Sequence, residues 1–321
     1  MLPLLIALSA ARAPPTVRTS LGAVRGNALL HADEFLGLPY GAAERFEPAV
    51  MRSEPFGAEP LDASYYGPAC KQTLSATETY GVEHGCHVLN IWRPKGTSAG
   101  ADLPVMLFIP GGSNDFGEAE PYNASEMAAT HRAVITSANY RVGPFGFAAF
   151  KERGAQTGNW ALTDHQAALR FVRQHVRAFG GDPRRLTLFG QSSAGGLSLL
   201  HAVAPSSAGL VQGLLAQSAD LSASPLSYSL STTSALAQQL NCTKGQSPKA
   251  CLLAASADAL VFAEKPAGAG WSPTVDGVMI PADPSVLVAK GAVNNVSVAL
   301  GCNTNDVRRS QPPDAPRSCD G

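Results

Sequence analysis

The sequence predicts an α/β protein whose mostly parallel central sheet is flanked by helices, and three observations carry that prediction. Continuous apolar or β-branched runs at 105–109 and 133–137 are typical of strands covered on both faces of a parallel sheet. Apolar residues recur at helical spacing over 164–178, and the Gly and Pro residues at 180–183 end that helix. The run 186–189 predicts the next strand, so strand and helix alternate as in βαβ units.

The region up to about Pro48 has a different pattern, with short apolar runs broken by glycine at 21–26 and 35–40. This pattern predicts a small N-terminal antiparallel sheet. With 321 residues, 45% of them hydrophobic and 15% charged, the chain can bury the core of one large globular domain. The 24 Lys and Arg balance 25 Asp and Glu, so no long-range field favours nucleic acid, and we expect no such partner.

Residues 1–13 are interpreted as a short secretory signal, because an apolar run at 2–8 is followed by a small-x-small site at 11–13. No Lys or Arg precedes the run, which leaves a buried N-terminal strand or a mis-assigned start as the alternatives. No other segment approaches the ~20 apolar residues of a membrane span. Export is also indicated by three glycosylation sequons, at Asn123, Asn241 and Asn295. We therefore expect a secreted or secretory-pathway protein.

The six cysteines are consistent with an oxidising compartment. Four of them lie in two closely spaced pairs, Cys70 with Cys86 and Cys242 with Cys251. Each pair has a spacing at which a disulfide would close a small surface loop. The remaining two, Cys302 and Cys319, have no obvious partner.

The segment 190–196 carries the chemistry. It reads Gly-Gln-Ser-Ser-Ala-Gly-Gly and joins the strand at 186–189 to a helix-compatible run, as a nucleophile elbow of the G-x-S-x-G type does. Ala194 replaces the second glycine, and Ser193 is a competing nucleophile. Ser192 is favoured because it lies three residues after the strand, where the apex of the turn falls. The alternative is a Ser- and Gly-rich turn that only caps a helix.

Around this elbow the sequence resembles the type-B carboxylesterase and cholinesterase family, from about Thr16 to Asp306. Residues 178–190 are close to the family's A-F-G-G-D-P-x-x-V-T-L-F-G, and further family segments lie at 139–147, 158–164 and 273–277. The resemblance implies an α/β-hydrolase domain over 14–306 that lacks its C-terminal part. It also implies hydrolysis of carboxylic esters through an acyl-serine at Ser192.

The resemblance extends to the oxyanion hole and the acid. Residues 110–117 resemble the family's H-G-G-G-F-x-x-G, which implies the backbone N–H groups of Gly112, Ser113 and Ser193 as donors. Ser113 and Asn114 replace a glycine and an aromatic residue, and a plain glycine loop is the alternative. Residues 300–306 resemble L-I-G-x-N-x-x-E and give Asp306 the role of orienting the histidine, although by residue type alone it would be a solvated turn residue.

The same resemblance implies that both cysteine pairs form loop disulfides, because they fall where the family has two of its own. It also implies that an acidic pair has been lost next to Cys86. His84 and Gly85 stand where the family has an acidic pair that anchors this loop to an arginine. We therefore expect Arg45 to lack its partner.

No histidine follows Asp306, although the order of the triad in this fold is Ser, acid, His. All seven histidines precede it: His31, His84, His87, His131, His165, His175 and His201. His201 follows Ser192 by nine helical residues, which places it roughly 13 Å along the helix from the nucleophile, too far to reach it. His165 and His175 are expected at surface or half-buried positions. The chain as given is thus expected to be almost inactive, with a disordered or aberrant tail at 307–321, as in a truncated or mis-spliced product.

We expect no metal and no cofactor. His84 and His87 flank Cys86, but a disulfide would consume that sulfur and no further ligand pair is spaced nearby. The expected substrate is a small neutral ester, because the loop between Cys70 and Cys86 has no Trp to hold a quaternary ammonium and Gln191 replaces the usual acid beside the nucleophile. The alternative function is a non-catalytic, cholinesterase-like adhesion or binding protein. The sequence makes no prediction of oligomeric state.

Overall fold

A computed structural model describes residues 13–73, 75, 78–151, 157–242, 245–264, 270–303 and 306. The predicted signal up to residue 12 and the tail at 307–321, with Cys319, lie outside the described residues. The described residues form a mostly parallel central sheet flanked by helices, which confirms the α/β class predicted from the sequence.

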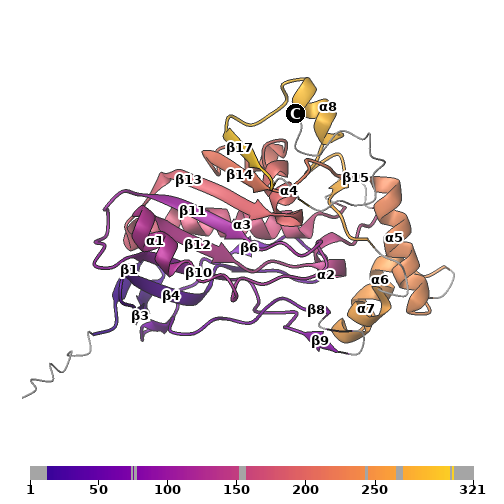
Figure 1. The fold of residues 1–321 in the computed structure, drawn as a ribbon. Coiled ribbons are helices and arrows are strands. Elements are labelled where there is room, and N and C mark those ends of the chain that lie inside the picture. The colour runs from indigo at the N-terminus through magenta and orange to yellow at the C-terminus, as the bar shows by residue number, and fades with distance from the viewer. Residues whose placement is uncertain are drawn as a thin grey trace, which may run out of the picture.

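The central sheet has eight strands among the described residues, in the order β17-β14-β13-β11-β12-β10-β4-β3 (Figure 1). The strands from β11 to β17 in this sheet run parallel to one another, and β10, β4 and β3 add antiparallel strands at the other edge. Their bounds are β3 Asn27–Ala28, β4 Ala32–Pro39, β10 Val88–Pro94, β11 Leu103–Ile109, β12 Val134–Ala138, β13 Gly181–Gln191, β14 Gly213–Gln217 and β17 Ser297–Gly301.

A small N-terminal sheet accompanies the central one. Strands β1 (Thr16–Thr19) and β2 (Gly22–Arg25) pair antiparallel, and β7 (Leu61–Asp62) adds a parallel strand to β2. Short two-stranded pairs complete the strands: β5 Gly41–Ala42 with β6 Val50–Met51, β8 Gln72–Thr73 with β9 Thr79–Tyr80, and β15 Ser224–Pro225 with β16 Thr274–Val275.

The helices lie around the central sheet. They are α1 Ser125–His131, α2 Gly143–Phe147, α3 Trp160–His175, α4 Ser193–Leu200, α5 Leu226–Gln239, α6 Pro248–Ala254, α7 Ala257–Glu264 and α8 Pro284–Ala289, with 3-10 turns at Val176–Phe179 and Pro205–Ser207. Helix α3 begins four residues before the predicted start, after Asn159 in the left-handed region at φ 61°. None of the described helices is long and apolar enough to cross a membrane.

The two faces of the central sheet are covered unequally. Val105, Leu107 and Ile109 of β11 belong to the main core together with residues of α3 and α4. The opposite face has a smaller cluster in which α1 covers Trp92 and Ile135. Strand β12 is buried along its whole length, but β11, β13 and β14 alternate between buried and half-buried positions. The strand at 105–109 is thus fully buried on one face and half-buried on the other, where Met106 packs against the smaller cluster.

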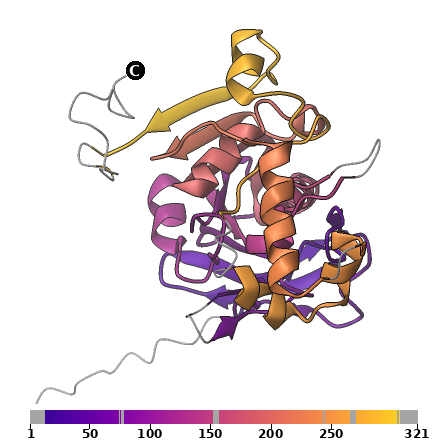
Figure 2. The same cartoon turned by 90° about the vertical axis from the view of Figure 1, so that its right-hand side faces the viewer.

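Strand register brings distant segments to one edge of the sheet. Ile109 lies beside Gly190, Gln191 beside Gln217, and Gln217 beside Gly301. Because these strands are parallel, the segments that follow β11, β13, β14 and β17 emerge at the same edge, where α/β sheets bind their ligands. Strand β17 forms the outer border of the sheet (Figure 2).

Candidate active site

Ser192 forms the sharp turn between β13 and α4. Its backbone angles are φ 57° and ψ −133°, a region that non-glycine residues rarely adopt and that is typical of functional sites. Its N–H donates to the carbonyl of Gln217 over 2.8 Å, and its carbonyl accepts from the N–H of Gly196 over 3.2 Å. The turn is thus fixed from both sides, by the neighbouring strand and by the first turn of the helix. The Ser192 side chain is half-buried.

The residues two before and two after Ser192 are packed against each other. A Cβ atom added at Gly190 would lie 2.6 Å from the carbonyl oxygen of Ala194, so glycine is required there. Ala194 itself is fully buried. At the next position, a Cβ atom on Gly195 would meet the Cβ of Ala219 at 2.6 Å. The elbow therefore accepts alanine at position 194, but it needs glycine at positions 190 and 195.

The loop after β11 lies directly against the elbow. A Cβ atom on Gly111 would lie 2.5 Å from the carbonyl oxygen of Gln191, so backbone contacts backbone here. Two N–H groups of the loop, those of Gly112 and Asn114, donate to the hydroxyl oxygen of Ser193 over 3.2 and 3.3 Å. Because an oxyanion hole consists of backbone donors that converge on one oxygen, this loop remains the candidate for that role.

The N–H groups that converge on Ser193 overlap only in part with the predicted oxyanion-hole donors, whose role stays a prediction. Gly112 was predicted, but the second N–H directed at this point belongs to Asn114 rather than Ser113. Ser113 is exposed, and both it and Asn114 have positive φ angles of 57° and 67°. The replacement of a family glycine by Ser113 and of a family aromatic residue by Asn114 was the only signal in the sequence that this loop turns differently.

Asp306 follows β17 at the same edge of the sheet. Its N–H donates to the carbonyl of Asn303 over 3.1 Å, and its carboxylate accepts from the N–H of Asn303 over 3.3 Å. The N–H of Ser218 donates to the carbonyl of Gly301 over 2.7 Å, which ties the start of this segment to the end of β14. Residues 304 and 305 lie outside the described residues. The role of Asp306 stays a prediction.

A cleft of about 600 Å³ opens beside the oxyanion loop. Its lining includes Gly111 from that loop, three carboxylates and three aromatic rings. The carboxylates are those of Asp115, Glu118 and Glu264, and the rings are those of Tyr80, Phe116 and Tyr122. Burial, and secondly the charge of Glu264, raise the pKa of Asp115 to about 6. The cleft is therefore acidic above that pH.

Comparison with known proteins decides the family. The family model described as "Carboxylesterase family" matches residues 13–317, nearly the whole chain. The chain belongs to the carboxylesterase family. The resemblance that the sequence motifs predicted is thereby confirmed.

Several relatives of this carboxylesterase-family chain are esterases or lipases by name. Para-nitrobenzyl esterase of Bacillus subtilis (strain 168) is 33% identical over 310 residues, covering 90% of this chain and 62% of the relative. Bile salt-activated lipase of Homo sapiens is 32% identical over 301 residues, covering 85% and 39%. Neuroligin-3 of Mus musculus is 30% identical over 360 residues, covering 94% and 44%.

Solved carboxylesterase structures share the fold. That of carboxylesterase EST55 from Geobacillus stearothermophilus superimposes with a TM-score of 0.81 at 27% sequence identity, covering 90% of this chain and 61% of that one. With shares of the curated relatives between 39% and 62%, this carboxylesterase-family chain spans about three-fifths of their length or less.

The buried histidines of this family member have partners away from Ser192. The Nε2 atom of His201 lies 3.3 Å from Nδ1 of His165, and Nδ1 of His201 lies 2.8 Å from the hydroxyl of Ser207. Burial lowers the pKa of His165 to about 4 and that of His201 well below its ordinary value. His165 and His175 are 0% and 3% exposed, so the prediction that they are surface or half-buried is wrong.

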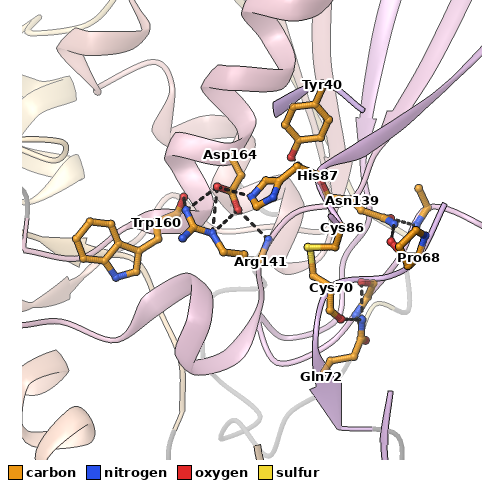
Figure 3. The surroundings of a disulfide bond; sticks show 12 residues. Tyr40, Pro68, Cys70, Gln72, Cys86, His87, Asn139, Arg141, Trp160 and Asp164 are labelled. Atoms are coloured by element: carbon orange, nitrogen blue, oxygen red, sulfur yellow. Dashed lines mark hydrogen bonds and ion pairs between the residues drawn. A yellow bond between two sulfur atoms is a disulfide. The ribbon is translucent and has the colours of Figure 1, made fainter. Parts of the chain in front are cut away.

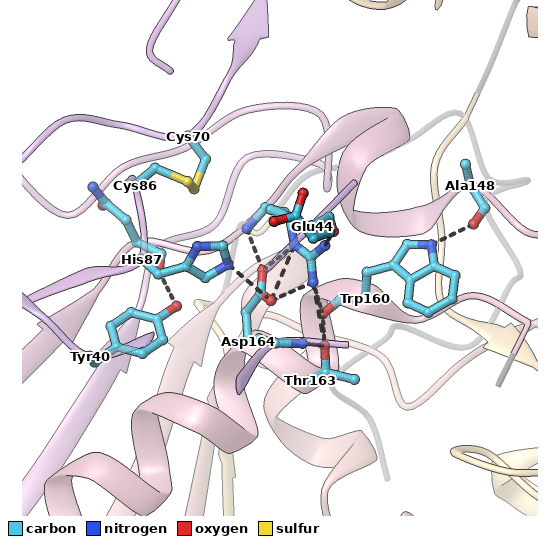
Figure 4. A network of polar contacts seen from close by, with 12 residues as sticks. Tyr40, Glu44, Cys70, Cys86, His87, Ala148, Trp160, Thr163 and Asp164 are labelled. Carbon is cyan, nitrogen blue, oxygen red and sulfur yellow. Dashed lines mark hydrogen bonds and ion pairs between the residues drawn. A yellow bond between two sulfur atoms is a disulfide. The ribbon is translucent and has the colours of Figure 1, made fainter. Parts of the chain in front are cut away.

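His87 directly follows Cys86 of the Cys70–Cys86 disulfide and belongs to a buried ionic cluster (Figure 3). Its Nε2 atom lies 3.2 Å from Oδ1 of Asp164. Oδ1 and Oδ2 of the same carboxylate accept hydrogen bonds of 2.7 and 2.9 Å from the guanidinium of Arg141 (Figure 4). Burial alone would raise the pKa of Asp164, but the charge of Arg141, followed by His87, outweighs it and holds the pKa below the ordinary value. This cluster joins the residue before β10, helix α3 and the segment before α2.

Arg45 has a partner that the sequence did not indicate. Its guanidinium forms a two-pronged ion pair with Glu83, directly before His84, and donates to carbonyls of Leu252 and Ala255 over 2.8 and 2.6 Å. The expectation that Arg45 lacks its partner is wrong. The acid has moved by one position, and the loop remains anchored to α6.

Both predicted disulfides are present, Cys70 with Cys86 and Cys242 with Cys251. Cys302 is also disulfide-bonded. The asparagines of the three sequons, Asn123, Asn241 and Asn295, are all exposed.

Proposed function

We propose that this chain carries the nucleophile and the oxyanion hole of a serine carboxylic-ester hydrolase. In the proposed reaction, the Ser192 hydroxyl oxygen bonds to the ester carbonyl carbon while its proton passes to a histidine. The carbonyl oxygen becomes an oxyanion next to the N–H groups of the loop after β11. The alcohol then leaves with that proton, and water hydrolyses the acyl-serine by the same route. Asp306 orients the histidine.

The observation that carries the proposal is the conformation of Ser192. A serine at φ 57° and ψ −133° costs of order 1–3 kcal/mol, and such strain persists where surrounding structure holds it. Here the turn lies against the loop whose N–H groups converge on the next residue, Ser193, and a Cβ atom added at Gly111 of that loop would lie 3.4 Å from the Cβ of Ser192. A turn that only capped a helix would use its side chain for the cap, and Ser192 makes no side-chain cap hydrogen bond.

The base is the part of the catalytic triad for which these 321 residues offer no candidate. No histidine follows Asp306 in the 321 residues, and the buried histidines His165 and His201 contact each other. Loss of the base of a serine hydrolase lowers turnover on the order of 10⁶-fold. We therefore propose that these residues by themselves are almost inactive, and that a histidine outside them completes the site.

The proposed substrate is a small neutral ester. The carboxylates of Asp115, Glu118 and Glu264 repel an anionic acyl group, and this repulsion grows as the pH rises through about 6, where Asp115 loses its proton. Cationic esters are the competing class. Acetylcholine, the choline ester, and 3,3-dimethylbutyl acetate have the same shape and differ only in a quaternary nitrogen that is replaced by a neutral carbon. The carboxylates also attract a cation, but no Trp between Cys70 and Cys86 holds a quaternary ammonium, and Gln191 replaces the usual acid beside Ser192. We therefore expect the neutral compound to protect Ser192 from a covalent label at least as well as the cationic one, and stronger protection by the choline ester would overturn the assignment.

Covalent labelling with a fluorophosphonate tests the proposal. By intact-mass analysis, the chain alone is expected to label very slowly at pH 7.5, because no base takes the proton of Ser192. Imidazole added at up to 100 mM supplies that base and is expected to speed labelling. Rapid stoichiometric labelling without imidazole would show that a base exists within these residues. No labelling with imidazole would count against the nucleophile.

A non-catalytic binding role is the second candidate, favoured by the missing histidine and by the relative neuroligin-3, which is not named as an esterase. A chimera in which the C-terminal part of the Bacillus subtilis para-nitrobenzyl esterase continues this chain after Asp306 separates the two. The hydrolase proposal predicts hydrolysis of p-nitrophenyl butyrate that Ser192→Ala abolishes. A folded but inactive chimera would favour binding.

We also propose that the protein enters the secretory pathway with residues 1–13 as its signal and carries glycans at Asn123, Asn241 and Asn295. The disulfides support this route, because they persist in oxidising compartments. A secreted lipase of Arthroderma benhamiae is 35% identical over 306 residues, covering 86% of this chain and 54% of that protein. A mass shift of the secreted protein on treatment with an N-glycosidase tests the proposal.

A further inference from the structure

The hydroxyl of Ser193 holds the place that a substrate oxygen would take. Ser193 is the first residue of α4, and its Oγ atom accepts hydrogen bonds from the N–H groups of Gly112 and Asn114 over 3.2 and 3.3 Å. Two backbone donors on one oxygen are what an oxyanion hole offers to a tetrahedral intermediate. We propose that the Ser193 hydroxyl fills the oxyanion hole of the resting protein and must leave before an ester can be acylated. This inference rests on the proposed function.

The donors are held in place by the loop itself and not by Ser193. The side-chain amide of Asn114 donates to the carbonyl of Trp271 over 3.0 Å, and the carbonyl of Asn114 accepts from Gly143 over 2.6 Å. The N–H groups of Asp115 and Phe116 both donate to the carbonyl of Gly112 over 3.0 and 3.1 Å. Asn114 is 9% exposed, so its backbone is part of the packed interior. A substrate oxygen would thus find the two N–H groups already aligned once the hydroxyl has moved.

Occupation by a hydroxyl affects the ground state and the transition state differently. A neutral ester carbonyl is no better an acceptor than the hydroxyl that it would displace, so it gains little from entering the hole. An oxyanion forms charge-assisted hydrogen bonds that are roughly twice as strong, and it can displace the hydroxyl. The two hydrogen bonds that Ser193 gives up slow acylation by on the order of tenfold, given the net value of ordinary hydrogen bonds. The hydroxyl therefore acts as a built-in competitor that favours the charged species.

The opposite role predicts the opposite sign. A hydroxyl that accepts two hydrogen bonds still has its own proton, which it could donate to an oxyanion without moving. In that case removal of the hydroxyl slows acylation, whereas removal of a competitor speeds it. The sign of the effect therefore separates the two roles.

The experiment measures the rate of fluorophosphonate labelling in 100 mM imidazole for the full chain. Ser193→Ala is expected to label about tenfold faster than the unchanged chain. In the shape-matched pair Ser193→Val and Ser193→Thr, the valine variant is expected to label faster, because only threonine keeps a hydroxyl. Ser198→Ala, in the same helix, removes a hydroxyl that donates to Ala194 over 2.8 Å outside the hole, and is expected to leave the rate unchanged. Equal or slower labelling of Ser193→Ala would overturn the proposal.

A second measurement does not depend on any chemistry at Ser192. In chains labelled with ¹⁵N at Gly and Asn, the amide protons of Gly112 and Asn114 are expected to move upfield in Ser193→Ala, because each loses its acceptor. Unchanged resonances would overturn the contact and the proposal with it. If no variant were labelled even with imidazole, the proposed function would fail, and the amide resonances would still decide whether the hydroxyl occupies this site.

Discussion

The two borders of the strand β13 differ in how firmly they are held. On one side, β11 pairs with β13 and is followed by β12, which is buried along its length, and the Arg141–Asp164–His87 cluster ties the residue before β10 to α3. On the other side, β14 leads to β17, whose residues are all exposed. The loop after β11, which contacts Ser192, lies on the firm side, and Asp306 follows the exposed strand. The proposed nucleophile, Ser192, is thus fixed by packing, whereas the proposed acid, Asp306, follows a strand with an exposed surface.

Removal of the buried charge on the firm side should have the largest effect. Asp164→Asn keeps the shape of the side chain but leaves Arg141 buried without its counter-charge. Because one-sided removal of a buried pair leaves an uncompensated ion, we expect the free energy of unfolding to fall by about 3–5 kcal/mol. Urea denaturation measures this change.

The control is a surface pair of the same types. Asp102 lies 3.1 Å from Arg177, and both side chains are 54% exposed. Asp102→Asn should change the free energy of unfolding by less than about 1 kcal/mol. A similar loss in both variants would contradict the structural weight given to the cluster.

Two residues that lie side by side in register test the difference between the strands directly. Leu214 of β14 is 1% exposed, and its neighbour Val298 of β17 is 50% exposed. We expect Leu214→Ala to lower the free energy of unfolding by about 2–5 kcal/mol through loss of buried apolar contact and a residual cavity. Val298→Ala should cost less than about 0.5 kcal/mol. Comparable losses in urea would mean that β17 is covered in solution.

The histidine pair predicts how stability changes with pH. His165 has a pKa of about 4 in the folded chain against 6.5 when exposed, so the unfolded chain binds more protons between these values. Its contribution to stability is complete above pH 6.5 and is lost as the pH falls to 4, by at most about 3 kcal/mol. His165→Gln should flatten this part of the profile. His131→Gln, at an exposed position, should leave the profile unchanged in denaturation curves at pH 7 and pH 5.

The parts of the site that follow from local signals were predictable. A glycine before and small residues after a serine, between a strand and a helix, indicate the elbow, and the parallel strands bring the glycine loop to the same edge. The long-range pairing of polar side chains could not be predicted from the sequence. The partner of Arg45 and the burial of His165 depend on which surfaces meet in the folded chain, and no local pattern reports that.

The oxyanion loop shows the same limit at finer scale. The sequence indicated that Ser113 and Asn114 replace a family glycine and a family aromatic residue, but not that Asn114 would turn its N–H towards Ser193. That direction depends on the positive φ angles of both residues and on the contact with Trp271. The half-exposed face of β11, β13 and β14 likewise depends on what covers the sheet, which the apolar runs do not specify.

The backbone strain at Ser192 gives the smallest expected effect. Glycine adopts φ 57° without the penalty that a Cβ brings, whereas alanine keeps the penalty. We expect Ser192→Gly to exceed Ser192→Ala in free energy of unfolding by up to about 1 kcal/mol, although glycine normally destabilises. A glycine variant that is less stable than the alanine variant would show that the turn is not strained.

The site of phosphonylation tests the central claim most directly. After labelling with a fluorophosphonate in 100 mM imidazole, peptide mapping by mass spectrometry identifies the modified residue. The account predicts one label per chain, on Ser192, and none in Ser192→Ala. A label on Ser193 or at any other residue of the folded chain would contradict it.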